Sequence, residues 1–222
     1  MPDDTNGLTY MMRRQGVNLD ITHRCPLECP RCQRFSSFTE KGLKVPGSDM
    51  PFEEFEKVTE RFKHINFCGQ VSDPVHHPKF IEFLEHTHSF YLRNQVDVEV
   101  RPRSVSVHHA SGGKPLRWYP KAFKANPRAK WWIGLDGLPK DSPKYRINQD
   151  GDKMIEILKL GKKYLEDPPI WQMIVFKFNE NDIDTCRDMA SDLGVDFAVI
   201  SSSRWLSNGD PLKPSSEYAL RL

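Results

Sequence analysis

Three cysteines within eight residues are the first feature of this sequence that could do chemistry. Cys25, Cys29 and Cys32 stand in the loop CPLECPRC, directly after the extended segment 17–21. Thiolates are the usual ligands of iron–sulfur clusters, and a short loop can bring three of them to one cluster. Three protein ligands leave one iron of a 4Fe–4S cluster open, as one position stays open on a catalytic zinc ion. The loop therefore predicts a cluster that binds another molecule.

A structural zinc site is the alternative interpretation of the same loop, with His23 or a distant residue as the fourth ligand. Zinc ligands usually come as two separated pairs, and no second pair is evident in the sequence. The other two cysteines, Cys68 and Cys186, are expected to pack as small apolar side chains. The total of five is odd, which argues against a disulfide framework.

Alternating extended and helical patterns must position this loop. The sequence predicts strands at 17–21, 64–68, 104–109, 130–135, 170–178 and 196–201, and helices at 51–62, 78–90, 152–165 and 181–193. Pro51 suits a first helical turn capped by Ser48 or Asp49, and Gly194 suits the C′ position of the last helix. Such β-then-α units indicate an α/β fold with a parallel sheet, whose ligands bind at the carboxyl ends of the strands.

The C-x3-C-x2-C motif after a first strand, in a chain of β/α units, resembles the radical SAM superfamily over about residues 17–201. The overall pattern is similar to short, single-domain members related to the peptide-modifying branch and to phage-encoded proteins. Three further stretches carry the likeness: CGQVSDP at 68–74 resembles the family's Gly-Gly-Glu-Pro-like motif, GLDG at 134–137 resembles Ser-Leu-Asp-Gly, and VFKFNEND at 175–182 resembles a fifth-strand segment. Arg146 follows Asp136 by ten residues, as an arginine does in many members.

This resemblance implies an incomplete (β/α)6 TIM-like barrel with parallel strands, formed by one domain over 1–222 with a tail at 202–222. It implies a 4Fe–4S cluster and S-adenosylmethionine (SAM) as cofactors. One electron from the reduced cluster would cleave SAM, and the resulting 5′-deoxyadenosyl radical would abstract hydrogen from an unknown substrate. A reductant such as flavodoxin or ferredoxin would supply the electron. The protein's own part is to position and enclose these groups.

The resemblance also implies cofactor contacts at particular residues. Gly69 and Gln70 would approach the SAM amine through backbone groups, and Arg146 would pair with the SAM carboxylate. Gly134 stands where many members have a serine that contacts the ribose. Phe176 is placed to line the adenine pocket.

Three positions depart from the family pattern. Arg31 replaces an aromatic residue that packs near the adenine, and a guanidinium can also stack on a base. Gln70 replaces the family's glutamate, or the role of that glutamate moves to Asp73. His108 lies where an asparagine is common, and is interpreted first as a hydrogen-bonded residue and second as part of the cofactor site or the catalytic machinery.

Composition leaves the substrate open. The chain has 222 residues, of which 38% are hydrophobic and 28% charged, and its net charge of +2 by itself predicts no polyanionic partner. The stretch 101–130 is basic, holds no acidic residue and includes Trp118 and Tyr119. Basic residues among aromatics can bind nucleic acid or a nucleotide, although lysines on a solvated face are the commoner explanation. A peptide substrate, a nucleotide or nucleic-acid substrate, and a non-catalytic electron-transfer protein therefore all remain candidates.

The sequence gives no sign of a membrane partner. No apolar run is long enough to cross a bilayer, and the first residues lack the apolar region of a signal peptide. We therefore expect a cytoplasmic protein.

Overall fold

A computed structural model describes residues 16–93, 104–202 and 205–215. Its sheet consists of six parallel strands in chain order: β1 (Gly16–Leu19), β2 (His64–Phe67), β3 (Ser104–His109), β4 (Lys130–Gly134), β5 (Ile170–Ile174) and β6 (Asp196–Ile200). In the described part of the chain, β1 and β6 lie at the two edges and do not pair with each other. This confirms the predicted α/β fold, an incomplete TIM-like barrel with one open side.

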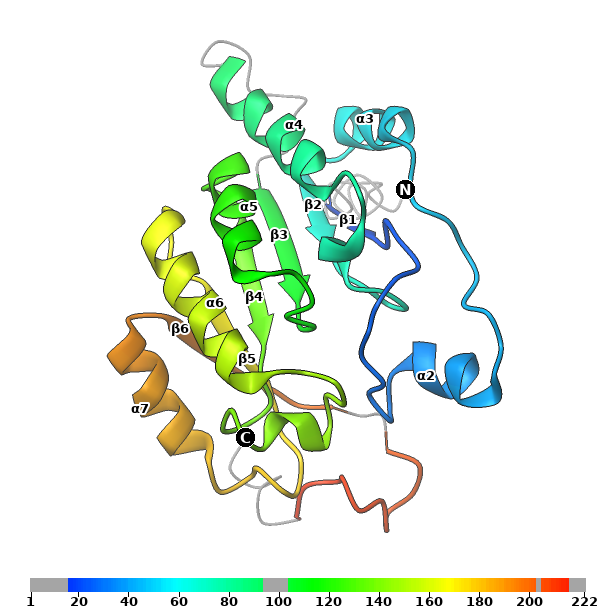
Figure 1. The fold of residues 1–222 in the computed structure, drawn as a ribbon, viewed down its shortest axis with the longest axis vertical. Coiled ribbons are helices and arrows are strands. Elements are labelled where there is room, and N and C mark those ends of the chain that lie inside the picture. The colour runs from blue at the N-terminus through cyan, green and yellow to red at the C-terminus, as the bar shows by residue number, and fades with distance from the viewer. Residues whose placement is uncertain (1–15, 94–103, 203–204, 216–222) are drawn as a thin grey trace, which may run out of the picture.

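Helices follow the strands and cover one face of the sheet (Figure 1). The connections carry α2 (Gln33–Ser37) and α3 (Phe52–Arg61) after β1, α4 (Phe80–Arg93) after β2, α5 (Tyr119–Ala125) after β3, α6 (Gly151–Tyr164) after β4, and α7 (Ile183–Leu193) after β5. The sequence did not predict α5, which lies inside the basic stretch. This helix has seven residues and a proline in its first turn, so it is too short to show a clear helical period.

The two faces of the sheet differ in polarity because side chains alternate along each strand. The face under the helices carries the buried side chains Ile65, Phe67, Val105, Val107, Trp131, Ile133, Trp171 and Met173. The other face carries Asn18, Asn66, Ser106, His108, Trp132 and Gln172, which are half-buried or exposed. Trp131 and Trp132 therefore lie on opposite faces, as their adjacent positions predict.

Several elements begin or end one to four residues from their predicted bounds, and two of these differences have a clear structural cause. β5 ends at Ile174, and the predicted continuation to residue 178 is wrong, because Asn179 closes a turn there. Its side chain accepts from Phe176 N at 2.7 Å and donates to Ile174 O at 3.0 Å. Pro51 itself is the N-cap of α3, and the predicted cap Asp49 instead accepts from the Thr22 hydroxyl at 2.6 Å.

Other expectations hold. Gly194 ends α7 in the left-handed conformation, with φ of 66°, and Cys186 is fully buried in the core beneath α7. The extended piece expected at 96–100 falls outside the described residues. Within the described ranges, none of the helices has the length and apolar character needed to cross a membrane.

Candidate functional site

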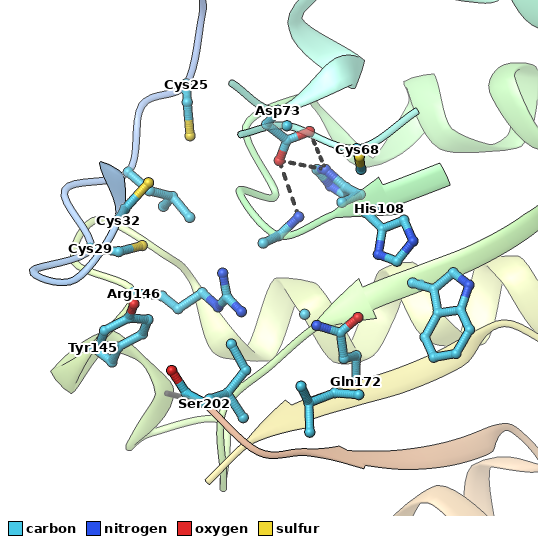
Figure 2. Close-up of a pocket in the computed structure, with 18 of the residues that line it drawn as sticks. Cys25, Cys29, Cys32, Cys68, Asp73, His108, Tyr145, Arg146, Gln172 and Ser202 are labelled. Carbon is cyan, nitrogen blue, oxygen red and sulfur yellow. Dashed lines mark hydrogen bonds and ion pairs between the residues drawn. The ribbon is translucent and has the colours of Figure 1, made fainter. Parts of the chain in front are cut away.

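A cavity of about 410 Å³ lies at the carboxyl ends of the strands (Figure 2). The loops and strand ends of β1 to β6 all contribute to it. Its lining comprises Cys25, Leu27, Cys29, Cys32, Cys68, Gly69, Ser72, Asp73, His108, His109, Ala110, Trp132, Gly134, Tyr145, Arg146, Gln172, Ile174, Ile200, Ser201 and Ser202. Side chains far apart in the sequence therefore share one cavity at the edge where parallel α/β folds bind ligands.

The cysteine loop is tied to its neighbours on both sides. Cys32 is the N-cap residue of α2, and its N–H donates to Cys29 O at 3.0 Å. The Arg34 guanidinium donates to His23 O and to Val71 O, which joins the loop to the connection after β2. On the other side, Asn148 donates to Pro26 O at 3.1 Å. These contacts hold the three thiols at the cavity without a disulfide.

Two of the three thiols lose their protons less readily here than a free cysteine does. Burial raises the pKa of Cys25 to about 12, with the Asp73 carboxylate adding to the effect. Burial also raises the pKa of Cys29 to about 11, against the opposing charge of Arg146. A thiol must lose its proton to bind a metal, so loading of this loop would release protons.

The three thiols line one cavity, but they do not converge on one position where a single metal ion could bind. In the described ranges, no three His, Cys, Asp or Glu side chains are gathered closely enough to hold one metal ion. A zinc site would need such convergence, whereas each thiolate of a 4Fe–4S cluster binds a different iron. Three cysteines that line one cavity are therefore a suitable set of thiolate ligands for a 4Fe–4S cluster.

Arg146 is held at the cavity by Asp136, just beyond β4. Its Nε lies 2.8 Å from Asp136 Oδ2, and the carboxylate is completely buried. The two groups form an ion pair at the end of β4. Burial raises the pKa of Asp136, and Arg146 opposes that rise. Figure 2 shows the rest of the guanidinium directed into the cavity, where it can meet a carboxylate.

Gly134 leaves the space that this arginine occupies. A Cβ built on Gly134 would lie 3.0 Å from Arg146 Nη2 and 3.1 Å from the Ala110 side chain. A buried Gln149, which the sequence analysis did not single out, donates to Gly134 O at 2.8 Å and to Ala110 O. It thereby ties the ends of β3 and β4 together beneath the cavity.

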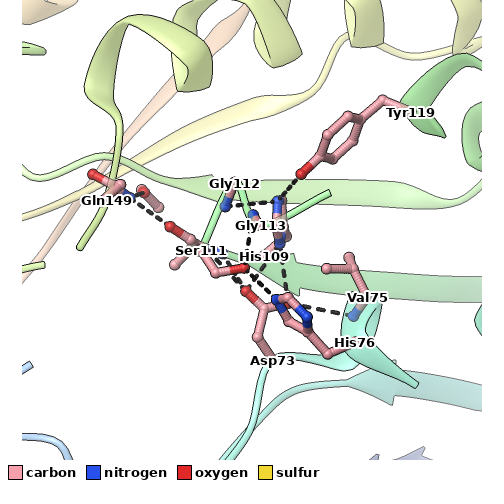
Figure 3. Close-up of polar contacts among 11 residues, drawn as sticks. Asp73, Val75, His76, His109, Ser111, Gly112, Gly113, Tyr119 and Gln149 are labelled. Carbon is pink, nitrogen blue, oxygen red and sulfur yellow. Dashed lines mark hydrogen bonds and ion pairs between the residues drawn. The ribbon is translucent and has the colours of Figure 1, made fainter. Parts of the chain in front are cut away.

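Asp73 joins the loop after β2 to the loop after β3 (Figure 3). Its carboxylate is 2.9 Å from His109 Nδ1 and accepts from Ala110 N at 3.1 Å and Ser111 N at 2.8 Å. Burial would raise its pKa, but His109 and these donors outweigh burial and hold the pKa well below its usual range. His109 Nε2 in turn meets the Tyr119 hydroxyl at 2.9 Å. Asp73 thus lines the cavity, but its carboxylate is already bound to His109 and to the backbone N–H groups after β3.

The turn after β2 requires glycine. A Cβ on Gly69 would lie 1.5 Å from Ser72 O, so no other residue fits without moving the backbone. Asp20 accepts from Gln70 N and Val71 N at 3.0 Å each, and from the Ser72 hydroxyl. The N–H of Gln70 is therefore already used, which leaves backbone carbonyls as the groups that could meet an amine.

A group of polar and aromatic side chains forms the sheet wall of the cavity. His108 lies in β3, and its ring stacks beside Trp132 at 5.5 Å between centroids and 4° between planes. Burial lowers the pKa of the imidazole, and the Gln172 side chain opposes that shift. Cys68 also lines the cavity and is half-buried, so it is not part of the buried core in which it was expected to pack. Gln172 belongs to no motif of the sequence, although alternation along β5 places it on the same face as His108.

Some of the sequence-predicted site residues lie outside the cavity lining. The structure brings together Cys25, Cys29, Cys32, Gly69, Asp73, His108, Gly134 and Arg146, and it leaves out Arg31, Gln70 and Phe176. Gln70 is exposed. Phe176 is only 1% exposed and packs behind Tyr145, with 4.2 Å between ring centroids. Arg31 turns to the C-terminal segment and binds Asp210.

The basic stretch uses several of its lysines in contacts within the protein. Lys114 lies 5.7 Å from the Trp118 ring, and Lys130 lies 5.6 Å from the Trp132 ring. Tyr119 is fully buried. Residues 101–103 fall outside the described residues. In the described part, this stretch therefore offers fewer free rings for stacking than its sequence indicates.

Comparisons with known proteins support the fold. Neither the protein-family models nor the curated protein sequences contain a match. Among solved structures, SuiB of Streptococcus suis is similar at a TM-score of 0.65 and 10% identity, over 97% of this chain and 49% of SuiB. Methylornithine synthase (PylB) is similar at a TM-score of 0.59 and 11% identity, over 88% of this chain and 55% of PylB. HemN of Escherichia coli, described as a radical SAM enzyme, is similar at a TM-score of 0.52 and 10% identity, over 98% of this chain and 53% of HemN.

These identities show a shared fold. The chain shares the fold of SuiB, PylB and HemN, and it spans about half the length of these three proteins. SuiB has also been solved bound to S-adenosylmethionine and bound to its precursor peptide SuiA.

Proposed function

We propose that this chain is a radical SAM enzyme. Cys25, Cys29 and Cys32 would hold a 4Fe–4S cluster through three thiolates, and SAM would occupy the adjoining cavity. The observation that carries the proposal is that these three thiols and Arg146 line one cavity at the carboxyl ends of the strands. The fold shared with radical SAM enzymes supports it, since SAM is bound in one of those structures.

When bound, the reduced cluster would supply the electron that splits SAM into methionine and a 5′-deoxyadenosyl radical able to abstract hydrogen. The chain's own residues would position the reactants. Arg146 would pair with the SAM carboxylate, because its guanidinium faces the cavity while Asp136 fixes its Nε edge. Gly69 would let the backbone come close to the SAM amine. Asp73 would support this site indirectly, by holding the loops after β2 and β3 together.

A peptide is the substrate class we propose first. SuiB, which has the same fold, binds a precursor peptide. The wall formed by His108, Trp132 and Gln172 carries no net charge when the imidazole is neutral, which suits a neutral polar group better than a phosphate. The lysine–ring contacts within the basic stretch weaken the nucleotide alternative. A one-electron donor such as flavodoxin or ferredoxin would reduce the cluster.

Anaerobic reconstitution tests the activity. The purified chain is loaded with iron and sulfide, reduced with dithionite, and incubated with SAM, and 5′-deoxyadenosine is quantified by chromatography. We expect the wild type and Cys186→Ala, which alters a core thiol far from the loop in sequence, to form 5′-deoxyadenosine, and Cys29→Ala to form none. A cluster that assembles without any SAM cleavage in the wild type would favour the non-catalytic electron-transfer alternative.

A further inference from the structure

The residue that precedes the third cysteine binds a carboxylate 179 positions later in the chain. We infer that Arg31 and Asp210 form a latch that fastens the segment 205–213 onto the cysteine loop and shields the cluster side of the cavity. Arg31 is then a positioning residue and does not stack on the adenine. The shielding part of this inference rests on the proposed cluster, whereas the fastening part concerns the chain alone.

The geometry of the latch is that of a two-point contact. Arg31 Nε lies 3.0 Å from Asp210 Oδ2, and Nη2 lies 3.2 Å from Oδ1. The Asp210 side chain is completely inaccessible, and that of Arg31 is 18% exposed. Paired hydrogen bonds between a guanidinium and a carboxylate are stronger and more directional than single ones, and removing either partner strands a buried charge.

The same carboxylate organises the C-terminal segment. Asp210 Oδ2 accepts from Leu206 N at 2.9 Å, and Oδ1 accepts from Leu212 N at 3.0 Å. The hydrogen bond from Arg31 and these two backbone donors lower the pKa of Asp210 to about 2, so the side chain stays ionised near neutral pH. One ionised group therefore holds both ends of the turn and also holds the loop that carries Cys32.

The segment packs against the cluster side of the cavity. Trp205 and Leu212 join the apolar group formed by Leu27, Cys29, Tyr145 and Phe176, which also contacts Cys25 and Cys32. Trp205 meets the edge of the Phe176 ring at 5.9 Å, and Lys177 N donates to Leu212 O at 3.1 Å. Apolar packing at this place keeps water away from the thiols. Release of the segment would remove this apolar packing from the group that includes Cys29.

Amide exchange on the cluster-free chain tests the fastening. The variants are Arg31→Ala and Asp210→Ala, with Arg31→Lys as a milder change that keeps the charge and loses the paired contact. Asp184→Asn is the matched control, because it breaks an exposed ion pair with Arg187 in α7. We expect exchange at Leu206 and Leu212 to be at least about tenfold faster in both alanine variants, intermediate in Arg31→Lys, and unchanged in the control. Unchanged exchange in Arg31→Ala would overturn the latch.

Air oxidation of the reconstituted cluster tests the shielding. We expect the cluster absorbance of Arg31→Ala and Asp210→Ala to bleach several-fold faster than that of wild type, at equal initial iron content. Faster amide exchange with unaltered bleaching would overturn the shielding role. Weaker SAM binding by Arg31→Ala with unaltered exchange would overturn the latch in favour of adenine stacking. If the wild type assembles no cluster, the proposed function fails, while the exchange result still decides the fastening.

Discussion

Arg146 Nε and Asp136 Oδ2 lie 2.8 Å apart, with the carboxylate completely buried at the end of β4. Asp136 also accepts from Ile174 N at 2.8 Å, so the same group joins the end of β4 to β5. The arginine proposed to bind SAM is thus part of the framework before any ligand arrives. Its replacement should affect both stability and cofactor binding, and the two effects can be separated.

The first prediction concerns this pair. Arg146→Gln leaves the Asp136 charge buried and unpaired, so the free energy of unfolding should fall by about 3–5 kcal/mol in urea denaturation. The double variant Arg146→Gln/Asp136→Asn should recover much of that loss, because the stranded charge is gone. SAM binding by calorimetry should be weak in both variants. Normal SAM affinity in the double variant would show that Arg146 does not bind the carboxylate.

The second prediction concerns the missing hydroxyl at Gly134. A serine here should be tolerated poorly, because its Cβ would come within 3.0 Å of Arg146 Nη2 and 3.1 Å of Ala110. Overpacking of this kind typically costs about 1–3 kcal/mol, and it should also move the guanidinium and weaken SAM binding. Gly16→Ser is the matched control, since its Cβ would meet its nearest neighbour at an ordinary 3.4 Å. A Gly134→Ser protein that binds SAM more tightly would show that the serine can fit beside Arg146.

The third prediction concerns the contact between the loops after β2 and β3. His109→Leu removes the partner of the buried Asp73 carboxylate and should lower the free energy of unfolding by about 3–5 kcal/mol. His64→Leu is the control, because His64 is exposed at the start of β2 and loses only an exposed hydrogen bond to Ser104, which should change stability by no more than about 1 kcal/mol. Equal losses in the two variants, measured by urea denaturation, would refute a special role for the Asp73–His109 pair.

The fourth prediction concerns pH. Burial lowers the pKa of His76, His77 and His108 in the folded chain. In the unfolded chain these histidines bind protons near pH 6.5, whereas in the folded chain they bind protons only at lower pH. The contribution of these groups to stability is therefore present above the unfolded pKa of about 6.5, and stability should fall as the pH drops from about 6.5 to 5.5. Melting temperatures at fixed ionic strength should show this fall, with a shallower slope in His108→Gln. A melting temperature that rises toward pH 5.5 would contradict the sign.

The sequence predicts those parts of the site whose residues lie close together in the chain. The three cysteines stand in one loop, so their spacing predicts that they act together. The role expected of Arg146, ten residues after Asp136, comes from the family resemblance. Period-2 alternation likewise places Trp132 opposite Trp131. The order of the strands follows from the β-then-α pattern, because parallel strands joined by helices tend to pair in sequence.

Contacts between distant segments could not be predicted in this way. The partner of Arg31 is Asp210, and no sequence pattern links a loop near the start to a turn near the end. Phe176 is placed next to the site by its motif, yet the turn closed by Asn179 carries it behind Tyr145. The engagement of Asp73 by His109 also depends on two loops meeting in space.

Electron paramagnetic resonance of the reduced, reconstituted chain tests the central claim most directly. The spectrum is recorded with and without SAM for wild type, Cys29→Ala and Cys186→Ala. If Cys25, Cys29 and Cys32 hold a cluster with an open iron, wild type and Cys186→Ala should give a reduced 4Fe–4S signal that shifts when SAM is added, and Cys29→Ala should give no such signal. A wild-type signal that SAM leaves unchanged, or an unaltered signal in Cys29→Ala, would contradict this assignment.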